Sequence, residues 1–296
     1  MMPPDILCIG SVLWDIIGRA PVAMRAGSDV PGRIIRLPGG VAMNIAMTLA
    51  RFGLRPALLS AVGRDPEGED LVREAARLGL ETATLYRSED LPTDSYMAIE
   101  GAGGLIAAIA DAHSLEQVGD KILRPLADGR LASEAAPWTG PVALDGNLTH
   151  ELLMRIAASP LFRAADLRVA PASPGKATRL LALLGHPSAT FYVNREEAGL
   201  ICRTSFNDAA RAARGLVAQG VHRALVTDGG AMAAEACGDR LRSARPPEVL
   251  VTRITGAGDT FMAAHIASEV QGMDPDTALT RALDAAAAHV SGESPQ

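Results

Sequence analysis

The sequence predicts an α/β protein with a doubly wound, mostly parallel sheet flanked by helices, and a small β-sheet lid. Apolar runs of strand length alternate with amphipathic stretches of helical spacing, which is typical of a parallel sheet covered by helices. Glycine closes many of the strand-like runs. Between residues 93 and 111, two short apolar runs flank a glycine turn, and this break in the alternation indicates a second, smaller sheet.

The size and composition of the chain fit one large domain. The chain has 296 residues, and 48% of them are hydrophobic, which is enough for a complete core. We therefore expect a single domain over residues 1–296, with lid strands drawn from about residues 12–38 and 93–111.

Strands of a parallel sheet appear as continuous apolar runs, because both of their faces are buried. We predict such strands at residues 6–10, 57–62, 142–145, 167–170, 190–193 and 223–227, followed by a hairpin within 229–242. Shorter strands of the lid are predicted at residues 16–19, 34–37, 96–99 and 105–109.

Helices are predicted from apolar residues that recur at a spacing of about 3.6. Val41, Ile45 and Leu49 give one such face, and Gly79 and Gly220 follow two other helices at the position where a helix end favours glycine. The predicted helices cover residues 41–52, 69–78, 151–158, 176–184, 209–218, 260–270 and 276–290.

A glycine-rich run, Thr255-Gly256-Ala257-Gly258-Asp259, connects the apolar residues 249–251, predicted as a strand, to the helix at 260–270. A tight turn at a helix N-terminus exposes backbone N–H groups and the positive end of the helix dipole, which suits an anion. Asp259 would repel a phosphate that is merely bound. It suits phosphate chemistry if its carboxylate takes a proton from an attacking hydroxyl while the amides hold the developing charge. An acid in the first helical turn also has a purely structural interpretation, so the run alone leaves both open.

Polar residues and glycines follow several predicted strands at their carboxyl ends, where doubly wound sheets bind ligands. They are Asp15, Asn44, Asp145, Asn147, Asn194, Glu197, Thr227, Gly229, Gly230 and the run that ends at Asp259. Each one alone is also explained as a cap or turn residue. Their shared position predicts one ligand site along this edge of the sheet.

The composition argues against several classes of function. The net charge is −6 without a basic block, and aromatic residues make up only 3%, so a nucleic acid polymer is not an expected partner. The three cysteines and six histidines are scattered without metal-ligand spacing, so we assign no metal or base role to any histidine. Neither a signal peptide nor an apolar run of about 20 residues is evident, and we expect a reduced, cytoplasmic protein without a membrane partner.

Three segments in order resemble one family. Residues 38–46 read Pro-Gly-Gly-Val-Ala-Met-Asn-Ile-Ala, residues 61–68 read Ala-Val-Gly-Arg-Asp-Pro-Glu-Gly, and residues 255–259 carry the Thr-Gly-Ala-Gly-Asp run. Over nearly the whole chain, this set resembles the ribokinase-like sugar and nucleoside kinases, the PfkB family. The resemblance implies an ATP-dependent kinase that phosphorylates a hydroxyl of a small sugar or nucleoside beneath a β-sheet lid.

The resemblance also implies roles for the residues that match the acceptor half of the site. Asp259 would be the general base, and the amides of Gly256, Ala257 and Gly258 would hold the transferring phosphate. The remaining matches would bind the hydroxyls of the sugar: Asp15, Gly39, Gly40 and Asn44.

For the donor half, Asn194 and Glu197 resemble the N-x-x-E of the family, in which Glu197 would help to place Mg²⁺, directly or through water. The nucleotide phosphates would contact Thr227, Gly229 and Gly230, and the small residues Ala285 and Ala286 would leave room beside the adenine. The family also implies a monovalent cation such as K⁺. An exposed lid edge predicts a homodimer that pairs through the lid.

Within the family, the lid segment is most similar to pseudouridine kinases. It carries Thr93-Asp94-Ser95-Tyr96 and a run from residue 105 that ends at Asp111. This implies phosphorylation of the 5′-hydroxyl of pseudouridine, with Thr93, Ser95 and Asp111 near the ribose or base.

Met232 stands where the nucleotide loop usually has Gly, which bears on the nucleotide. Leu13 departs from many members, and Ala110 and Ala112 depart from the residues frequent in that group. Another nucleoside, such as adenosine or inosine, or a sugar of the ribokinase or fructokinase type, therefore stays open as the acceptor. A non-enzymatic sugar or nucleoside sensor is disfavoured, because the general base Asp259 and the anion-binding turn of residues 256–258 (the anion turn) are both present. A dinucleotide-binding oxidoreductase is disfavoured, because residues 10–13 lack G-x-G-x-x-G.

Overall fold

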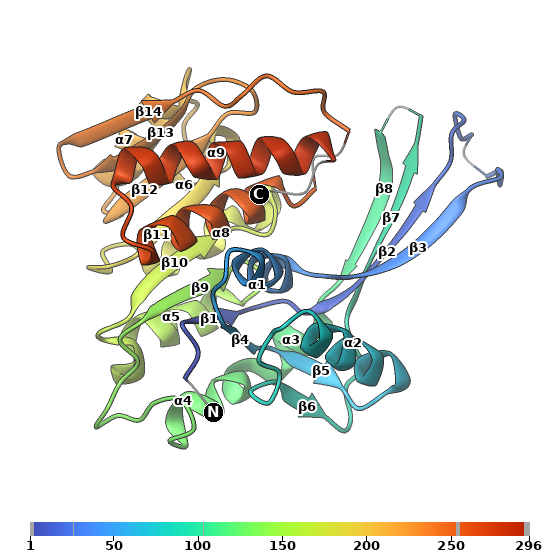
Figure 1. Ribbon diagram of the computed structural model, residues 1–296, viewed down its shortest axis with the longest axis horizontal. Helices are drawn as coiled ribbons and strands as arrows, with labels where there is room; N and C mark the ends of the chain where they lie inside the picture. The colour runs from blue at the N-terminus through green and yellow to red at the C-terminus, as the bar shows by residue number, and fades with distance from the viewer. Residues whose placement is uncertain (1–2, 26, 103, 253–254, 293–296) are drawn as a thin grey trace.

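The computed structural model describes residues 3–25, 27–102, 104–252 and 255–292, and its central feature is an eight-stranded sheet (Figure 1). The strand order is β14-β13-β12-β11-β10-β9-β1-β4. The strands from β4 to β12 run parallel, and β13 and β14 add an antiparallel hairpin at one edge. The strands span Ile6–Ile9 (β1), Pro56–Leu59 (β4), Pro141–Asp145 (β9), Asp166–Ala170 (β10), Thr190–Asn194 (β11), Arg223–Thr227 (β12), Ala233–Cys237 (β13) and Arg240–Ala244 (β14). The predicted doubly wound fold is confirmed.

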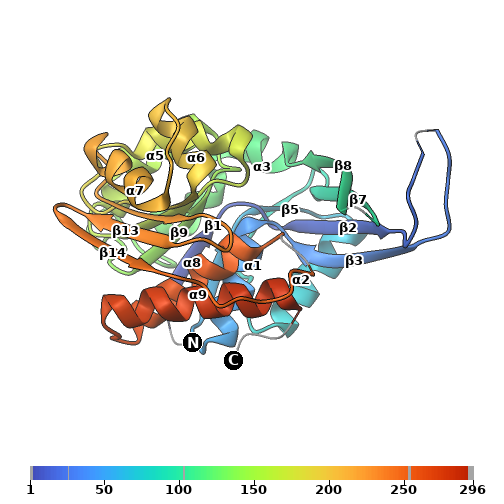
Figure 2. The ribbon, with the colours of Figure 1, turned by 90° about the horizontal axis from the view of Figure 1, so that it is seen from above.

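Helices cover both faces of this sheet, as Figure 2 shows. One face carries α1 (Val41–Arg51), α2 (Pro66–Arg77), α8 (Ala257–Val270) and α9 (Pro275–Ser291). The other carries α5 (His150–Ala158), η3 (Pro174–Leu183), α6 (Arg195–Cys202) and α7 (Ala209–Ala218). Alternate residues of the strands enter the two cores: Leu7 and Ile9 face one layer, while Ile6 and Cys8 face the other. This double burial explains why the strands read as unbroken apolar runs.

A second, four-stranded sheet projects beside the large one, in the order β3-β2-β7-β8 (Figure 1). Its strands are β2 (Leu13–Arg19), β3 (Arg33–Gly39), β7 (Ser95–Gly101) and β8 (Gly104–Asp111). These include all four predicted lid strands. Residues 26 and 103, which fall within the predicted lid segments, lie outside the described residues.

Two predictions of strands are wrong. The run at 57–62 is divided: β4 ends at Leu59, and β5 (Ala61–Gly63) pairs with β6 (Tyr86–Ser88) in a separate two-stranded sheet. The cause is that β4 lies at the edge of the large sheet, so the chain can leave it as soon as its partner β1 ends. Residues 249–251 do not form a strand either. They follow two prolines beyond the edge strand β14, and Leu250 is 81% exposed.

Other elements were not predicted or differ in type. The predicted helix at 176–184 corresponds to η3, which is a 3₁₀ helix. Three short helices follow β8 without having been predicted: α3 (His113–Val118), η1 (Gly119–Leu123) and α4 (Arg124–Ala127). The 3₁₀ helix η2 (Pro160–Phe162) was not predicted either. In the described part of the chain, no helix is both long and apolar enough to span a membrane.

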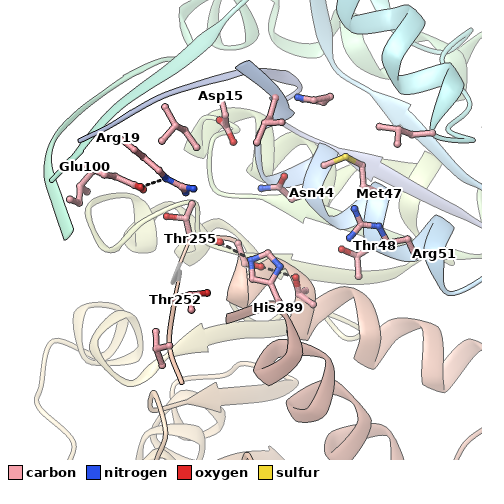
Figure 3. Close-up of a pocket in the computed structure, with 18 of the residues that line it drawn as sticks. Asp15, Arg19, Asn44, Met47, Thr48, Arg51, Glu100, Thr252, Thr255 and His289 are labelled. Atoms are coloured by element: carbon pink, nitrogen blue, oxygen red, sulfur yellow. Dashed lines mark hydrogen bonds and ion pairs between the residues drawn. The ribbon is translucent and has the colours of Figure 1, made fainter. Parts of the chain in front are cut away.

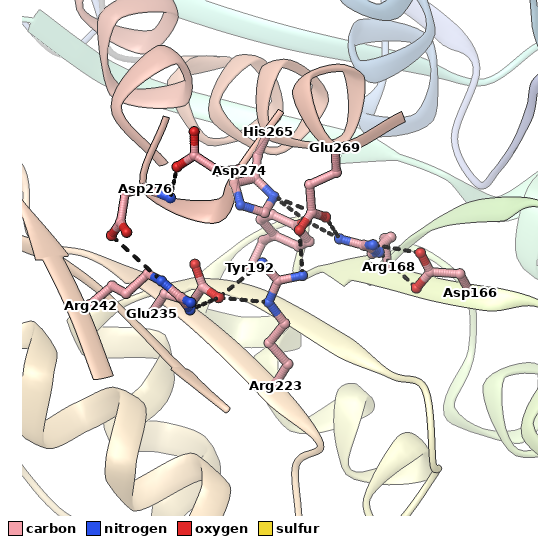
Figure 4. A network of polar contacts seen from close by, with 10 residues as sticks. All are labelled: Asp166, Arg168, Tyr192, Arg223, Glu235, Arg242, His265, Glu269, Asp274 and Asp276. Atoms are coloured by element: carbon pink, nitrogen blue, oxygen red, sulfur yellow. Dashed lines mark hydrogen bonds and ion pairs between the residues drawn. The ribbon is translucent and has the colours of Figure 1, made fainter. Parts of the chain in front are cut away.

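A buried ion-pair network fastens the C-terminal half of α8 to the sheet (Figure 4). The Glu269 carboxylate accepts from Arg168 of β10 at 2.5 Å and from Arg223 of β12 at 2.7 Å. Burial opposes the ionisation of Glu269, but the two guanidinium groups outweigh it and lower its pKa to about 2. One turn earlier, His265 Nδ1 lies 2.9 Å from the Tyr192 hydroxyl. These contacts fix the position of α8, whose other end carries Asp259.

Candidate active site

A cavity of about 540 Å³ lies between the small sheet, α1 and the N-terminal end of α8 (Figure 3). Asp15 and Arg19 of β2 line it from the small sheet, and Asn44 lines it from α1. Gly256 and His289 line it from the other side. The structure thus brings together predicted residues that are more than 200 positions apart in the sequence, at the edge where ligands bind in doubly wound sheets.

Asp145, which is fully buried at the end of β9, holds the first turn of α1, the helix that carries Asn44. Its Oδ2 accepts from the Ser11 N–H at 2.7 Å, the Ser11 hydroxyl at 2.9 Å and the Ala42 N–H at 3.2 Å. Its Oδ1 accepts from the Asn147 N–H at 2.6 Å. Gly10 has no side chain because a Cβ there would overlap this carboxylate. Asp145 therefore ties the ends of β1 and β9 to the first turn of α1.

Two glycines let α1 begin directly beneath Asp15. Gly40 has φ 91° at the N-cap, and a Cβ there would lie 2.5 Å from the Ser11 carbonyl oxygen. A Cβ on Gly39 would overlap the Asp15 carboxylate, so this carboxylate lies against bare backbone. Burial raises the pKa of Asp15 to about 6.

Asp259 lies in the first turn of α8, after the Gly256 N-cap, which has φ 84°. Its Oδ2 accepts a hydrogen bond of 2.9 Å from the Asn44 side-chain amide. Burial raises the pKa of Asp259 to about 7; the Asn44 hydrogen bond opposes this, and the charges of Asp145 and Asp15 add to it. The site therefore holds a carboxylate that exchanges its proton near neutral pH, beside the free amides of a helix N-terminus.

Thr93, Ser95 and Asp111, which were predicted to lie near the ribose or base, do not line the cavity of Asp15. The Thr93 hydroxyl donates to Asp65, the N-cap of α2, at 2.5 Å. Ser95 is opposite Trp14 and Asp111 in the strand register, whereas Tyr96 is opposite Asp15. Because neighbours in register share a face and successive residues alternate, Ser95 and Asp111 lie on the face that Asp15 does not use.

Tyr96, by contrast, shares the face of Asp15. Burial raises the pKa of its phenol, and the charges of Asp15 and Glu100 raise it further.

The residues predicted to bind the nucleotide gather at the ends of β11 and β12 and on α9. Asn194 and Thr227 are neighbours in register. Asn194 and Glu197 form a capping box at the start of α6: the Glu197 N–H donates to Asn194 Oδ1 at 2.9 Å, and the Asn194 N–H donates to Glu197 Oε2 at 2.8 Å. Burial raises the pKa of Glu197 to about 7. Gly229 and Gly230 form the exposed turn after β12. None of these residues lines the cavity of Asp15.

On α9, Ala285 is buried in the core and Ala286 is half-buried. Neither lines the cavity of Asp15. Over the described ranges, no group of three or more His, Cys, Asp or Glu side chains is arranged to hold a metal ion.

Several lining residues were not singled out from the sequence. Arg19 pairs with Glu100 at 2.5 Å across β2 and β7, above the cavity. The signal that could have found Arg19 is strand alternation, since residues 15, 17 and 19 share one face of β2. His289 of α9 lies with its Nε2 2.8 Å from the Thr255 carbonyl oxygen, as Figure 3 shows. Nothing in the sequence indicates this contact, which depends on how α9 packs.

Comparisons with known proteins agree with this geometry. The profile of the pfkB family carbohydrate kinases matches residues 3–296. The chain is 29% identical over 285 residues to a pseudouridine kinase of Escherichia coli (strain K12), covering 90% of this chain and 84% of that protein. It is 31% identical over 293 residues to an uncharacterized sugar kinase, YeiI, of the same organism, covering 96% and 78%. The structure of Arabidopsis thaliana ribokinase complexed with ribose and ATP superposes with a TM-score of 0.77 at 19% identity, covering 98% of this chain and 93% of that one.

Proposed function

Since the chain belongs to the pfkB family of carbohydrate kinases, we propose that it transfers the terminal phosphoryl group of ATP to the 5′-hydroxyl of pseudouridine. The observation that carries the proposal is Asp259, a carboxylate with a pKa of about 7 in the first turn of α8. It is hydrogen-bonded to Asn44, which lines a cavity large enough for a nucleoside.

Asp259 acts as the general base. Its Oδ2 is held by Asn44, so Oδ1 accepts the proton of the acceptor hydroxyl as that oxygen attacks the phosphorus. A base with a pKa near the working pH combines a large ionised fraction with useful basicity. The N–H groups of Gly256, Ala257 and Gly258 hold the charge of the transferring phosphoryl group, because a left-handed glycine N-cap leaves these amides without a side-chain cap.

The sugar hydroxyls bind to Asp15, to the backbone of Gly39 and Gly40, and to Asn44. Ionised above its pKa of about 6, Asp15 accepts hydrogen bonds from hydroxyl groups, and the absence of a side chain on Gly39 leaves room for this carboxylate. The small sheet acts as the lid of a single kinase domain that comprises the whole chain. It contributes Asp15, Ile17 and the Arg19–Glu100 pair to the cavity wall.

ATP binds at the ends of β11 and β12, against Asn194, Thr227, Gly229 and Gly230, with its adenine beside Ala285 and Ala286. Support comes from the register that pairs Asn194 with Thr227 and from the exposed glycine turn. Glu197 fits a role in holding Mg²⁺, because its Oε1 accepts no hydrogen bond among the described residues and Mg²⁺ needs only one or two carboxylates besides water and phosphate. When bound, Mg²⁺ would neutralise charge on the phosphates.

The identity of the acceptor rests on relatives and on size. A cavity of about 540 Å³ is in the range of sites for ligands as large as a nucleoside. The relative at 31% identity is named a sugar kinase, and a free ribose or ketose is therefore the second candidate.

A homodimer through the small sheet is a further part of the proposal. On the face away from Asp15, Ile34, Met97 and Ile109 are 79%, 47% and 70% exposed. An apolar patch of this kind is a contact surface for a second copy. A monomer at all concentrations in sedimentation velocity would exclude this contact. A cytoplasmic location stays a prediction.

The test is ATP consumption with Mg²⁺, with and without K⁺, against pseudouridine, uridine, adenosine, inosine, ribose and fructose. We expect turnover with pseudouridine that is lost in Asp259→Asn. Turnover with another acceptor keeps the kinase chemistry and reassigns the substrate. Tight binding of a nucleoside without turnover of any acceptor would favour a sensor instead.

A further inference from the structure

We propose that His289 is a positioning residue that aims the first amide of the anion turn. This inference rests on the proposed function of that turn. His289 lies in the last turn of α9, and its Nε2 is 2.8 Å from the carbonyl oxygen of Thr255. A carbonyl oxygen can only accept, so Nε2 carries the hydrogen of this bond.

The bond acts on Gly256 through the geometry of the peptide unit. The carbonyl of Thr255 and the N–H of Gly256 belong to one planar trans peptide, in which they point in opposite directions. Holding the carbonyl on His289 therefore sets the direction of the Gly256 N–H. Hydrogen bonding to the carbonyl also polarises the peptide, which makes the N–H a stronger donor.

Gly256 and the imidazole are also in close proximity. A Cβ on Gly256 would lie 3.2 Å from His289 Nε2, which is tighter than ordinary contact, and φ at Gly256 is 84°. Glycine thus serves both the backbone conformation and the approach of the imidazole.

A second tie lies one residue further along α9. Thr252 donates to the Val290 carbonyl from its N–H at 2.8 Å and from its hydroxyl at 3.1 Å. The segment before α8 is therefore fastened to the end of α9 both at Thr252 and at Thr255. Of these two ties, only that of His289 acts on a peptide of the anion turn, and His289 also lines the cavity (Figure 3).

The test compares His289→Leu, which fills similar space without a donor, with His289→Gln, whose amide can donate from nearly the position of Nε2 but cannot titrate. The matched control is His150→Leu. It removes a 3.1 Å contact between another helical histidine and a carbonyl, that of Arg179, which is outside the cavity.

We expect His289→Leu to lower kcat by about 10- to 100-fold, because loss of a whole oxyanion donor costs about 100- to 1,000-fold and here the donor is only misdirected. KM for the acceptor should change less than about threefold, because the tie acts on the transition state. His289→Gln should restore kcat to within about threefold of the wild type, and His150→Leu should leave it unchanged.

A kcat for His289→Leu within threefold of the wild type would overturn the proposal, and so would an equal loss in His289→Gln, which would indicate an acid, base or charge role. Hydrogen exchange separates this outcome from failure of the proposed function. If the wild type phosphorylates nothing, the amides of residues 255–260 should still exchange at least about tenfold faster in His289→Leu than in His289→Gln. Equal exchange rates in the two variants would refute the tie itself.

Discussion

Replacing Asp259 by Asn should abolish turnover and, at the same time, stabilise the fold. The substitution preserves the shape of the side chain, and its amide oxygen can still accept from the Asn44 amide. It removes only the charge and the basicity. A catalytic base and a structural carboxylate therefore give opposite predictions for stability.

The expected magnitudes follow from the pKa of Asp259, which is raised from 3.8 to about 7. A shift of one unit corresponds to about 1.4 kcal/mol, so ionisation of Asp259 in the folded protein opposes folding by up to about 4 kcal/mol. Solvent reaches part of the side chain, and we expect about half of this, near 2 kcal/mol, which is a rise of about 4 °C in the melting temperature. Loss of a general base should lower kcat by about 100- to 10,000-fold.

The raised pKa of Asp259 also determines how its effect on stability changes with pH. A raised pKa means that the stability contributed by protonated Asp259 is fully present below about 3.8 and is lost as the pH rises through 7. The stabilisation by Asp259→Asn should therefore be larger at pH 8 than at pH 5.5. In the wild type, kcat should rise with pH up to about 7 and then level off.

The assay combines ADP formation with thermal melting at pH 5.5 and pH 8. Asp239→Asn, on the exposed turn between β13 and β14, is the control for the chemical change and should affect neither measurement. Turnover of Asp259→Asn within tenfold of the wild type would refute the role of base. A lower melting temperature at pH 8 would show that Asp259 is structural instead.

Two further predictions concern the acceptor site and the ion-pair network. Gly39→Ala introduces a Cβ that overlaps the Asp15 carboxylate. In initial-rate measurements, KM for the acceptor should therefore rise at least about tenfold, while KM for ATP should stay within about twofold. Equal changes in the two KM values would contradict the assignment of Asp15 to the acceptor site. Glu269→Ala leaves Arg168 and Arg223 buried without their shared carboxylate and should lower the free energy of unfolding by about 3 to 5 kcal/mol in urea titrations. Because the pKa of Glu269 is lowered to about 2, its contribution in the wild type should be complete above about 4.5 and decline as the pH falls towards 2; a loss below about 1 kcal/mol at pH 7 would refute this account.

The large sheet was predictable because its strands are buried on both faces. That burial gives continuous apolar runs, and glycines mark their ends. The same signal fails where an apolar run does not indicate which partner the strand takes. Residues 57–62 read as one strand, but the chain changes sheets between Leu59 and Ala61. Residues 249–251 are apolar and two of them are β-branched, yet they follow the last edge strand and have no partner in the described sheets.

The candidate site was predictable at positions where the local backbone conformation or a close contact requires glycine. A positive φ requires glycine at Gly40 and Gly256, and the close approach of Asp15 requires it at Gly39. These glycines are part of the sequence motifs, so the motifs indicate the positions. Lid residues were not predictable in this way, because their face depends on strand register. A shift by one residue exchanges the faces, and Ser95 and Tyr96 illustrate the two outcomes.

The two ends of α8 carry carboxylates with opposite effects on the stability of the fold. Asp259 at the N-terminal end is an unfavourable carboxylate, and about ten residues later Glu269 is a favourable one, roughly 15 Å away along the helix. The ion pairs of Glu269 fasten the helix at the end away from the candidate site. The other end is then free to carry a half-buried acid, a left-handed glycine and amides without a side-chain cap. A variant that weakens the Glu269 network should therefore lower kcat along with stability, because the position of Asp259 depends on it.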